Sequence, residues 1–196
     1  MKTQVYLVFD EKMALHRPIH NPDNPDYYAF ENPDRVLKVY GKLLDLERHL
    51  ARSESNVVNS LTIDNGGLVF PRFIELACKP VERETVELVH SREHYDWLYH
   101  TSFLSDQALL GTTDPDDLYI CQSTFLAASL ACGGAVQCVD AVTDKETNIT
   151  RAIALVRPPG HHAERSEAMG RYNRSSLLFK TMVLLLQWLL NRLRER

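Results

Sequence analysis

Apolar residues along the chain form short continuous runs, separated by stretches in which they recur with the period of a helix. The run QVYLVFD over residues 4–10 and the run RAIALV over residues 151–156 are typical of buried parallel strands. A third, shorter run at residues 68–70 follows two glycines and is a weaker strand candidate. Strands that alternate with helices predict an α/β fold.

Several longer segments show helical patterns. The first begins after a polar loop, with Asn32 as candidate N-cap, Pro33 as first helical residue and apolar residues at three- and four-residue steps up to Leu50. Residues 81–104 contain two helical patterns that break next to Ser91, which can cap the second.

Residues 123–142 form a strongly apolar helical segment, rich in alanine and other small residues. Gly133 and Gly134 stand in its middle, where the missing side chains allow another backbone to approach closely. This composition predicts a buried helix packed against the sheet.

The composition fits one globular domain or a piece of a larger one. The chain has 196 residues and a mass of 22.5 kDa, with 44% hydrophobic and 24% charged residues. Its net charge of −4 and pI near 6.1 argue against a nucleic-acid-binding domain. The chain shows no secretory signal and no CxxC pair, so a nuclear or cytosolic protein with buried thiols is expected.

Two adjacent histidines, His161 and His162, follow the second strand and a rigid RPPG turn. Functional groups gather at the carboxyl ends of strands in open α/β sheets, which is where this pair falls. One neutral imidazole can act as a general base while its neighbour holds charge. Two chance histidines in a surface loop are the alternative, and the strand and turn in front of them favour a functional pair.

The remaining histidines carry weaker signals. His90 and His94 have the four-residue spacing of helical metal ligands, but no acidic or cysteine third ligand is evident and the helix break falls between them. Structural roles are therefore favoured for both. His16 and His20 lie in a polar loop, where solvated or hydrogen-bonding roles are expected.

Residues 150–170, TRAIALVRPPGHHAERSEAMG, resemble the core signature of the zinc-dependent histone deacetylase family, in its class II, yeast Hda1-like branch. The segments ENPDRVLKVYGKL, ELVHSREHYDWL and DLYICQSTFLAASLACGGAVQCVDAV are similar to further family segments in the same order. The resemblance implies an incomplete arginase/deacetylase-like parallel sheet flanked by helices, in three α/β/α layers. Residues 1–170 are then the N-terminal part of the catalytic domain, and residues 171–196 a divergent apolar and basic tail.

The resemblance also implies a site for the hydrolysis of acetyl-lysine, in which a zinc ion polarises the acetyl carbonyl and activates a water. His162 would be the general base and acid, and His161 its electrostatic partner. Gly170 would line the channel for the acetyl-lysine stem, and Asp116 or Asp117 would bind the substrate backbone at the rim. Gln122 stands where family members commonly have proline.

Partners follow from the same resemblance. Acetylated histone tails are the implied substrates and deacetylase complexes the implied assemblies, with chromatin silencing in the nucleus as the implied role; a cytoplasmic location stays open. Neither nucleic acid nor a membrane is an expected direct partner.

The family pattern stops after residue 170. The family's zinc ligands include an Asp-x-His pair, and none occurs in these 196 residues; the tyrosine that stabilises the oxyanion is missing too. We therefore expect this chain to hold no zinc and to be inactive alone, with half of the catalytic apparatus and an open sheet edge. The alternative is a non-catalytic interaction protein that uses the half-domain to bind a partner.

The tail allows three interpretations. Its apolar stretch, residues 177–190, is shorter than the roughly 20 residues of a membrane span. A helix that fills the place of the next family helix is favoured over a membrane anchor. A segment without a native role, from out-of-frame or intron translation, is the third interpretation.

Overall fold

The computed structural model describes residues 4–19, 32–57, 72–111, 119–144, 146, 149–160 and 163–168. Three parallel strands lie at its centre in the order β2-β1-β3: β1 (Gln4–Val8), β2 (Arg72–Leu76) and β3 (Ala152–Ala154). The middle strand, β1, pairs in register with both neighbours, and Tyr6 lies opposite Ile74 and Ala152. The parallel sheet between helices confirms the predicted α/β class.

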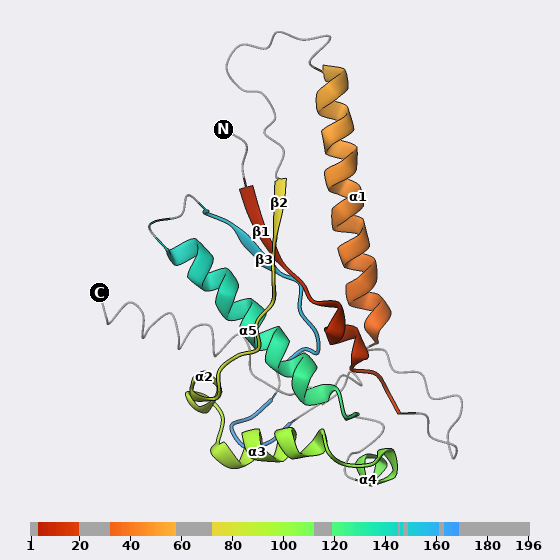
Figure 1. Ribbon diagram of the computed structural model, residues 1–196, viewed down its shortest axis with the longest axis vertical. Helices are drawn as coiled ribbons and strands as arrows, with labels where there is room; N and C mark the ends of the chain where they lie inside the picture. Colours follow the sequence, from red (N-terminus) through yellow and green to blue (C-terminus); the bar gives the residue numbers. More distant parts are fainter. Residues whose placement is uncertain are drawn as a thin grey trace.

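Two long helices flank this sheet, α1 (Pro33–Val57) and α5 (Thr124–Thr143) (Figure 1). The 3-10 helix η1 (Glu11–Leu15) follows β1. Three short helices lie together at one end of the molecule: α2 (Arg83–Glu87), α3 (Arg92–Thr101) and α4 (Asp106–Leu110).

The predicted helix starts are confirmed by their capping contacts. The Asn32 side chain accepts a hydrogen bond from the Asp34 amide at 3.1 Å, as an N-cap before Pro33 does. Ser91 Oγ accepts the His94 amide proton at 3.2 Å and so caps α3.

The strands agree with the sequence less completely. Gln4–Val8 is a strand as predicted, while β3 occupies only part of the run over residues 151–156. The strand candidate at residues 68–70 lies outside the described residues, and the observed β2 was not predicted. Its sequence, RFIEL, has two adjacent apolar residues between charged ones in a short, partly exposed edge strand, so it lacks the two-residue alternation that signals a strand.

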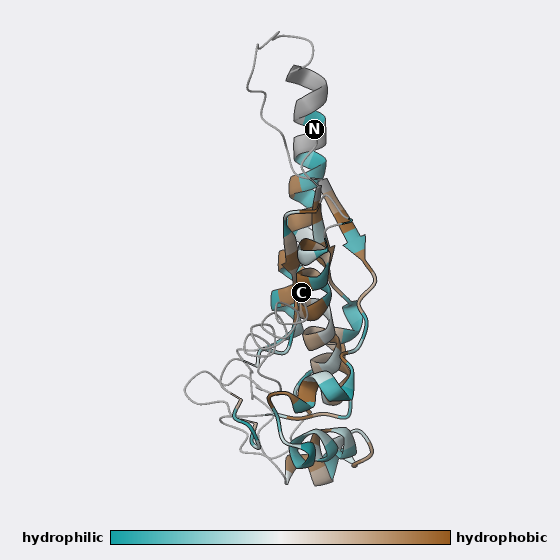
Figure 2. Ribbon diagram, turned by 90° about the vertical axis from the view of Figure 1, so that its left-hand side faces the viewer, coloured by the Kyte–Doolittle hydropathy of each residue, from teal (hydrophilic) through white to brown (hydrophobic). Residues whose placement is uncertain are grey.

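Helix α5 packs closely against β1 and against the chain that follows β2, as its small residues predicted. A methyl group built on Gly133 would lie 1.8 Å from the Lys79 carbonyl oxygen, and one on Gly134 would lie 2.8 Å from a Val8 methyl carbon. By length and composition α5 could cross a membrane, but 56% of its most apolar window is buried inside the protein. Apolar residues gather along α5 and the sheet (Figure 2), which identifies α5 as the core helix of the fold.

Helix α1 is held to the other side of the sheet by Tyr40. Its ring stacks on Phe9 with 4.2 Å between centroids, and its hydroxyl donates to Glu75 at 2.8 Å. Among the described residues, β3 has a strand neighbour on one side only, and Ile153 in its middle is 37% exposed. The sheet edge at β3 is therefore open within the described part of the chain.

Candidate functional site

The predicted site residues His161, His162, Asp116, Asp117 and Gly170 all lie outside the described residues. The structure does describe the chain on both sides of the histidine pair, residues 149–160 and 163–168. The contacts of these flanking residues show how the segment that bears the pair is held.

Arg157 fixes the chain in front of the pair. Its side chain is buried, with 2% exposed. One guanidinium nitrogen donates to the Met13 carbonyl oxygen at 2.8 Å and also to the carbonyl oxygen of His16. The other donates to the Tyr119 hydroxyl at 2.7 Å. We call Arg157 with Met13, His16 and Tyr119 the arginine clamp.

The chain is fixed again directly after the pair. Ala163 is fully buried, and its amide donates to the Gly160 carbonyl oxygen at 3.3 Å, so the chain ends on either side of the two histidines lie close together. The Arg165 carbonyl oxygen accepts the Ser91 amide proton at 2.8 Å and lies 3.3 Å from His90 Nδ1. The histidine pair therefore lies between two segments that are bonded to different parts of the fold.

The ring of His16 makes further contacts within the clamp and next to it. His16 is fully buried, its ring stacks on Tyr119 with 4.6 Å between centroids, and its Nδ1 lies 2.9 Å from Thr124 Oγ1. Burial, and then the nearby Arg157 cation, hold the pKa of His16 well below its ordinary value of 6.5, so the ring is neutral near pH 7. The predicted hydrogen-bonding role is confirmed, whereas the solvated alternative is wrong for His16; His20 lies outside the described residues.

Sequence reasoning missed Arg157 itself. The available signal was a single cation between an apolar strand and two prolines, a position where an unpaired charge would be costly to bury. Its hydrogen bonds go mainly to backbone carbonyl oxygens more than a hundred residues away in the sequence, and such partners leave no pattern.

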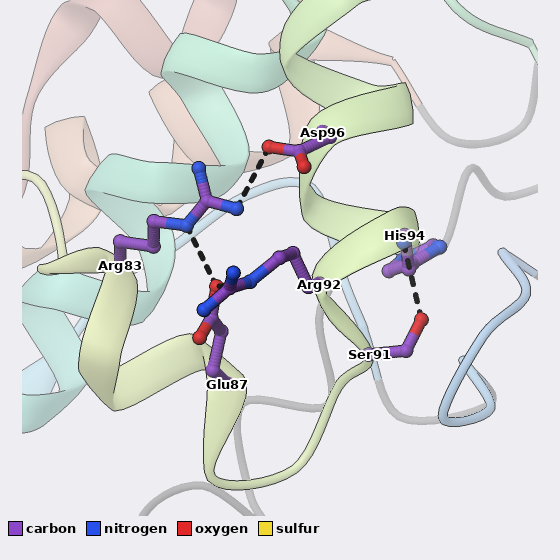
Figure 3. A network of polar contacts seen from close by, with 6 residues as sticks. All are labelled: Arg83, Glu87, Ser91, Arg92, His94 and Asp96. Carbon is purple, nitrogen blue, oxygen red and sulfur yellow. Dashed lines mark hydrogen bonds and ion pairs between the residues drawn. The ribbon is translucent and has the colours of Figure 1, made fainter.

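His90 and His94 are both buried, and their rings stack with 5.0 Å between centroids. Trp97 extends the stack, with its centroid 5.8 Å from that of His94. Figure 3 shows His94 at the start of α3, beside the cap from Ser91. These contacts support structural roles for both histidines, and the bonds of His90 and Ser91 to the Arg165 carbonyl oxygen join the start of α3 to the chain after the histidine pair.

Within the ranges that the structure describes, no three His, Cys, Asp or Glu side chains gather closely enough to hold a metal ion. The residues that the family resemblance places at the site, His161 and His162 among them, lie outside these ranges.

Comparison with known proteins agrees with the fold and the motif. Residues 30–181 match the histone deacetylase domain family. The histone deacetylase HDA1 of Saccharomyces cerevisiae is 28% identical over 170 residues, which cover 84% of this chain and 22% of that protein. The histone deacetylase clr3 of Schizosaccharomyces pombe is 30% identical over 181 residues, covering 90% of this chain and 23% of that protein.

A solved structure gives the same result for the fold. A crystal structure of the HDA15 HD domain aligns with 99% of this chain and 44% of its own, at a TM-score of 0.61 and 24% sequence identity. The chain spans about a fifth of the length of the two yeast relatives and less than half of the solved domain. The described fold is thus a partial α/β deacetylase fold.

Proposed function

The chain belongs to the histone deacetylase family, corresponding to the N-terminal part of the catalytic domain, and from this we propose that it supplies the acid–base half of a lysine deacetylase site. His162 takes the proton from the attacking water and later returns it to the leaving amine, and His161 supports the charge of the neighbouring ring. The observation that carries the proposal is that the chain is hydrogen-bonded to the fold on both sides of the histidine pair. Arg157 makes these bonds before the pair, and Ala163 and Arg165 make them after it.

This half-site does not suffice for amide hydrolysis. The family is zinc-dependent, and the 196 residues contain no Asp-x-His pair of the kind that the family resemblance implies as zinc ligands. General acid–base catalysis contributes about 10²–10⁴-fold, and peptide-like amides need a polarised carbonyl as well. We therefore propose that these residues alone have no deacetylase activity.

The proposed substrate is an acetyl-lysine side chain in a histone tail, and the proposed setting is chromatin silencing in the nucleus. Asp117 binds the substrate backbone and Gly170 lines the channel in this proposal. The names of the yeast relatives support it, since both are histone deacetylases.

The open edge of the sheet suggests how the other half is supplied. A continuous apolar run such as RAIALV belongs in a strand with neighbours on both sides. Within the described residues β3 has only β1 beside it, and the solved domain is more than twice as long as the matched part. We propose that the rest of a catalytic domain adds to this edge.

The test combines the chain with a second polypeptide, the part of S. cerevisiae HDA1 that follows the segment matched here. We expect no turnover of an acetylated histone peptide by the chain alone, even with zinc added, and zinc-dependent turnover by the mixture. His162→Ala in the mixture lowers the rate by about 10²-fold or more. His49→Ala, on an exposed position of α1, is the matched control and leaves the rate unchanged.

Three outcomes contradict the proposal. Turnover by the purified chain alone refutes the half-site. A mixture that co-elutes as one complex but remains inactive refutes complementation. A wild-type rate with His162→Ala refutes the acid–base assignment.

One observation favours the non-catalytic alternative. Tyr99 and Phe103 are 48% and 65% exposed, and their rings contact each other edge to face, next to Phe125. Exposed aromatic groups of this kind are enriched at protein interfaces. A stable complex in cells that survives His162→Ala and is lost with Phe103→Ser favours this function over deacetylation.

A further inference from the structure

Resting on the proposed function, a further role can be assigned to a residue that the family motif leaves without one. Arg157 stands four positions before His161, and its guanidinium binds oxygen atoms from two other parts of the chain. One part is the segment after β1, through the Met13 and His16 carbonyl oxygens. The other is Tyr119, which precedes α5.

Tyr119 connects this clamp to the predicted substrate rim. It stands two positions after Asp117 in the sequence, and it is itself held in place by the stack on the buried His16 ring. The hydrogen bond of 2.7 Å between Arg157 and the Tyr119 hydroxyl therefore joins the segment that leads to the catalytic pair with the segment that follows the rim.

We propose that Arg157 is a positioning residue for the deacetylase reaction. It fixes the chain before the histidine pair and, through Tyr119, ties this chain to the segment that follows the predicted rim residue. Arginine suits this task because its planar guanidinium donates in several fixed directions at once, whereas lysine is a point donor on a flexible stem.

A simpler explanation is that the clamp only stabilises the fold. The two roles differ in where the molecule opens when the clamp is weakened. A general loss of stability raises the hydrogen-exchange rate of core amides and loop amides together, whereas loss of positioning acts locally. The Ala163 amide is a suitable reporter, because its bond to Gly160 joins the described residues that stand directly before and after the histidine pair in the sequence.

The experiment measures amide hydrogen exchange by NMR on the intact chain carrying Arg157→Lys or Tyr119→Phe. We expect exchange of the Ala163 amide to accelerate at least about tenfold more than exchange of α5 amides such as those of Leu130 and Ala131, in both variants. Tyr119→Phe removes one hydroxyl and keeps the ring on His16, so it tests the clamp even where Arg157→Lys fails to fold. Tyr99→Phe removes a hydroxyl from an exposed ring and is the matched control.

Selective acceleration at Ala163 in Tyr119→Phe supports positioning. Equal acceleration at Ala163 and in α5, or none at Ala163, overturns it and leaves Arg157 as a stabilising residue. Because exchange is read from the chain alone, its outcome is separate from the complementation assay. If Ala163 exchange is selectively accelerated but the mixture with the HDA1 part is inactive, the local effect of the clamp is supported and the proposed function is refuted.

Discussion

Arg157 and Arg83 each bind several oxygen atoms, one inside the protein and the other at its surface. The Arg157 side chain is 2% exposed and donates to carbonyl and hydroxyl oxygens. The Arg83 side chain is 37% exposed and pairs with Glu87 at 2.6 Å and Asp96 at 2.8 Å, and Arg92 adds a longer contact to Glu87 (Figure 3). We call this second group the surface network.

The difference between the two groups concerns what replaces a lost partner. When an exposed ion pair breaks, water solvates both charges, so the pair contributes little to stability. When a buried donor is removed, the oxygen atoms that it served have no water to turn to, and each unsatisfied group costs free energy. The surface network therefore contributes little to the free energy of unfolding despite its short distances. The clamp contributes more, although its acceptor oxygens are uncharged.

The largest expected effect comes from Arg157→Leu. Leucine keeps much of the apolar stem but leaves the Met13 and His16 carbonyl oxygens and the Tyr119 hydroxyl without their donor. We expect the free energy of unfolding to fall by about 3–5 kcal/mol, measured by urea denaturation. Arg151→Leu, at an exposed position six residues earlier, is the control and should change it by less than about 0.5 kcal/mol. A similar loss of unfolding free energy in both variants would show that the clamp contributes no more than an exposed arginine.

A smaller effect is expected at Thr124, which supports the clamp through His16. Its hydroxyl accepts the Cys121 amide proton at 2.8 Å and lies 2.9 Å from His16 Nδ1. Thr124→Val keeps the shape and removes these bonds, so stability should fall by about 1–3 kcal/mol in the same urea titration.

Thr143→Val is the matched control at the other end of α5. That hydroxyl bonds to the Val139 carbonyl oxygen of its own helix, which is already served by the helical amide, so the change should cost less than about 0.5 kcal/mol. An equal cost at both ends of the helix would contradict the idea that buried support for the clamp decides the effect.

The helices show what the sequence could predict. The starts of α1 and α3 were foreseeable because a cap is a local contact between Asn32 or Ser91 and an amide a few residues on. The burial of α5 was foreseeable because its composition is small and apolar along its whole length. Such features can be predicted because they depend only on residues close together in the sequence.

The clamp was not foreseeable for the opposite reason. Arg157 meets Met13 and His16 across 144 and 141 positions, and it bonds to their backbone oxygens, which every residue possesses. His16 looked like a loop histidine because its burial depends on the Tyr119 ring, which only the folded chain brings to it. The RPPGHH motif identified the candidate site, whereas the contacts that hold its first residue required the structure.

The pH dependence of stability sharpens the comparison further. The pKa of His16 is lowered in the folded protein by burial and by Arg157. Below pH 6.5 the His16 ring therefore binds a proton in the unfolded chain while it stays neutral in the folded chain. The contribution of neutral His16 is thus complete above this pH and is lost as the pH falls below it, by at most about 1.4 kcal/mol per pH unit.

Urea midpoints between about pH 8 and pH 5 measure this slope. His16→Gln should be less stable near neutral pH but should lose less stability on acidification than the parent chain. His49→Gln, at an exposed position on α1, should follow the parent chain. A His16→Gln curve parallel to that of the parent chain would show that His16 titrates normally.

The smallest expected effect is that of Arg83→Ala in the surface network. The paired carboxylates of Glu87 and Asp96 are 25% and 53% exposed, so water can replace the lost guanidinium at both. Stability should therefore change less than in Arg157→Leu, Thr124→Val or His16→Gln, and about 1 M NaCl should remove most of the change, because salt screens exposed charges. Urea midpoints at low and high salt measure this, and a double-mutant cycle with Glu87→Ala separates the ion pair from the contact of Arg83 with the Tyr95 ring. A salt-independent loss as large as that of Arg157→Leu would mean that exposure does not distinguish the two arginines, and the comparison would fail.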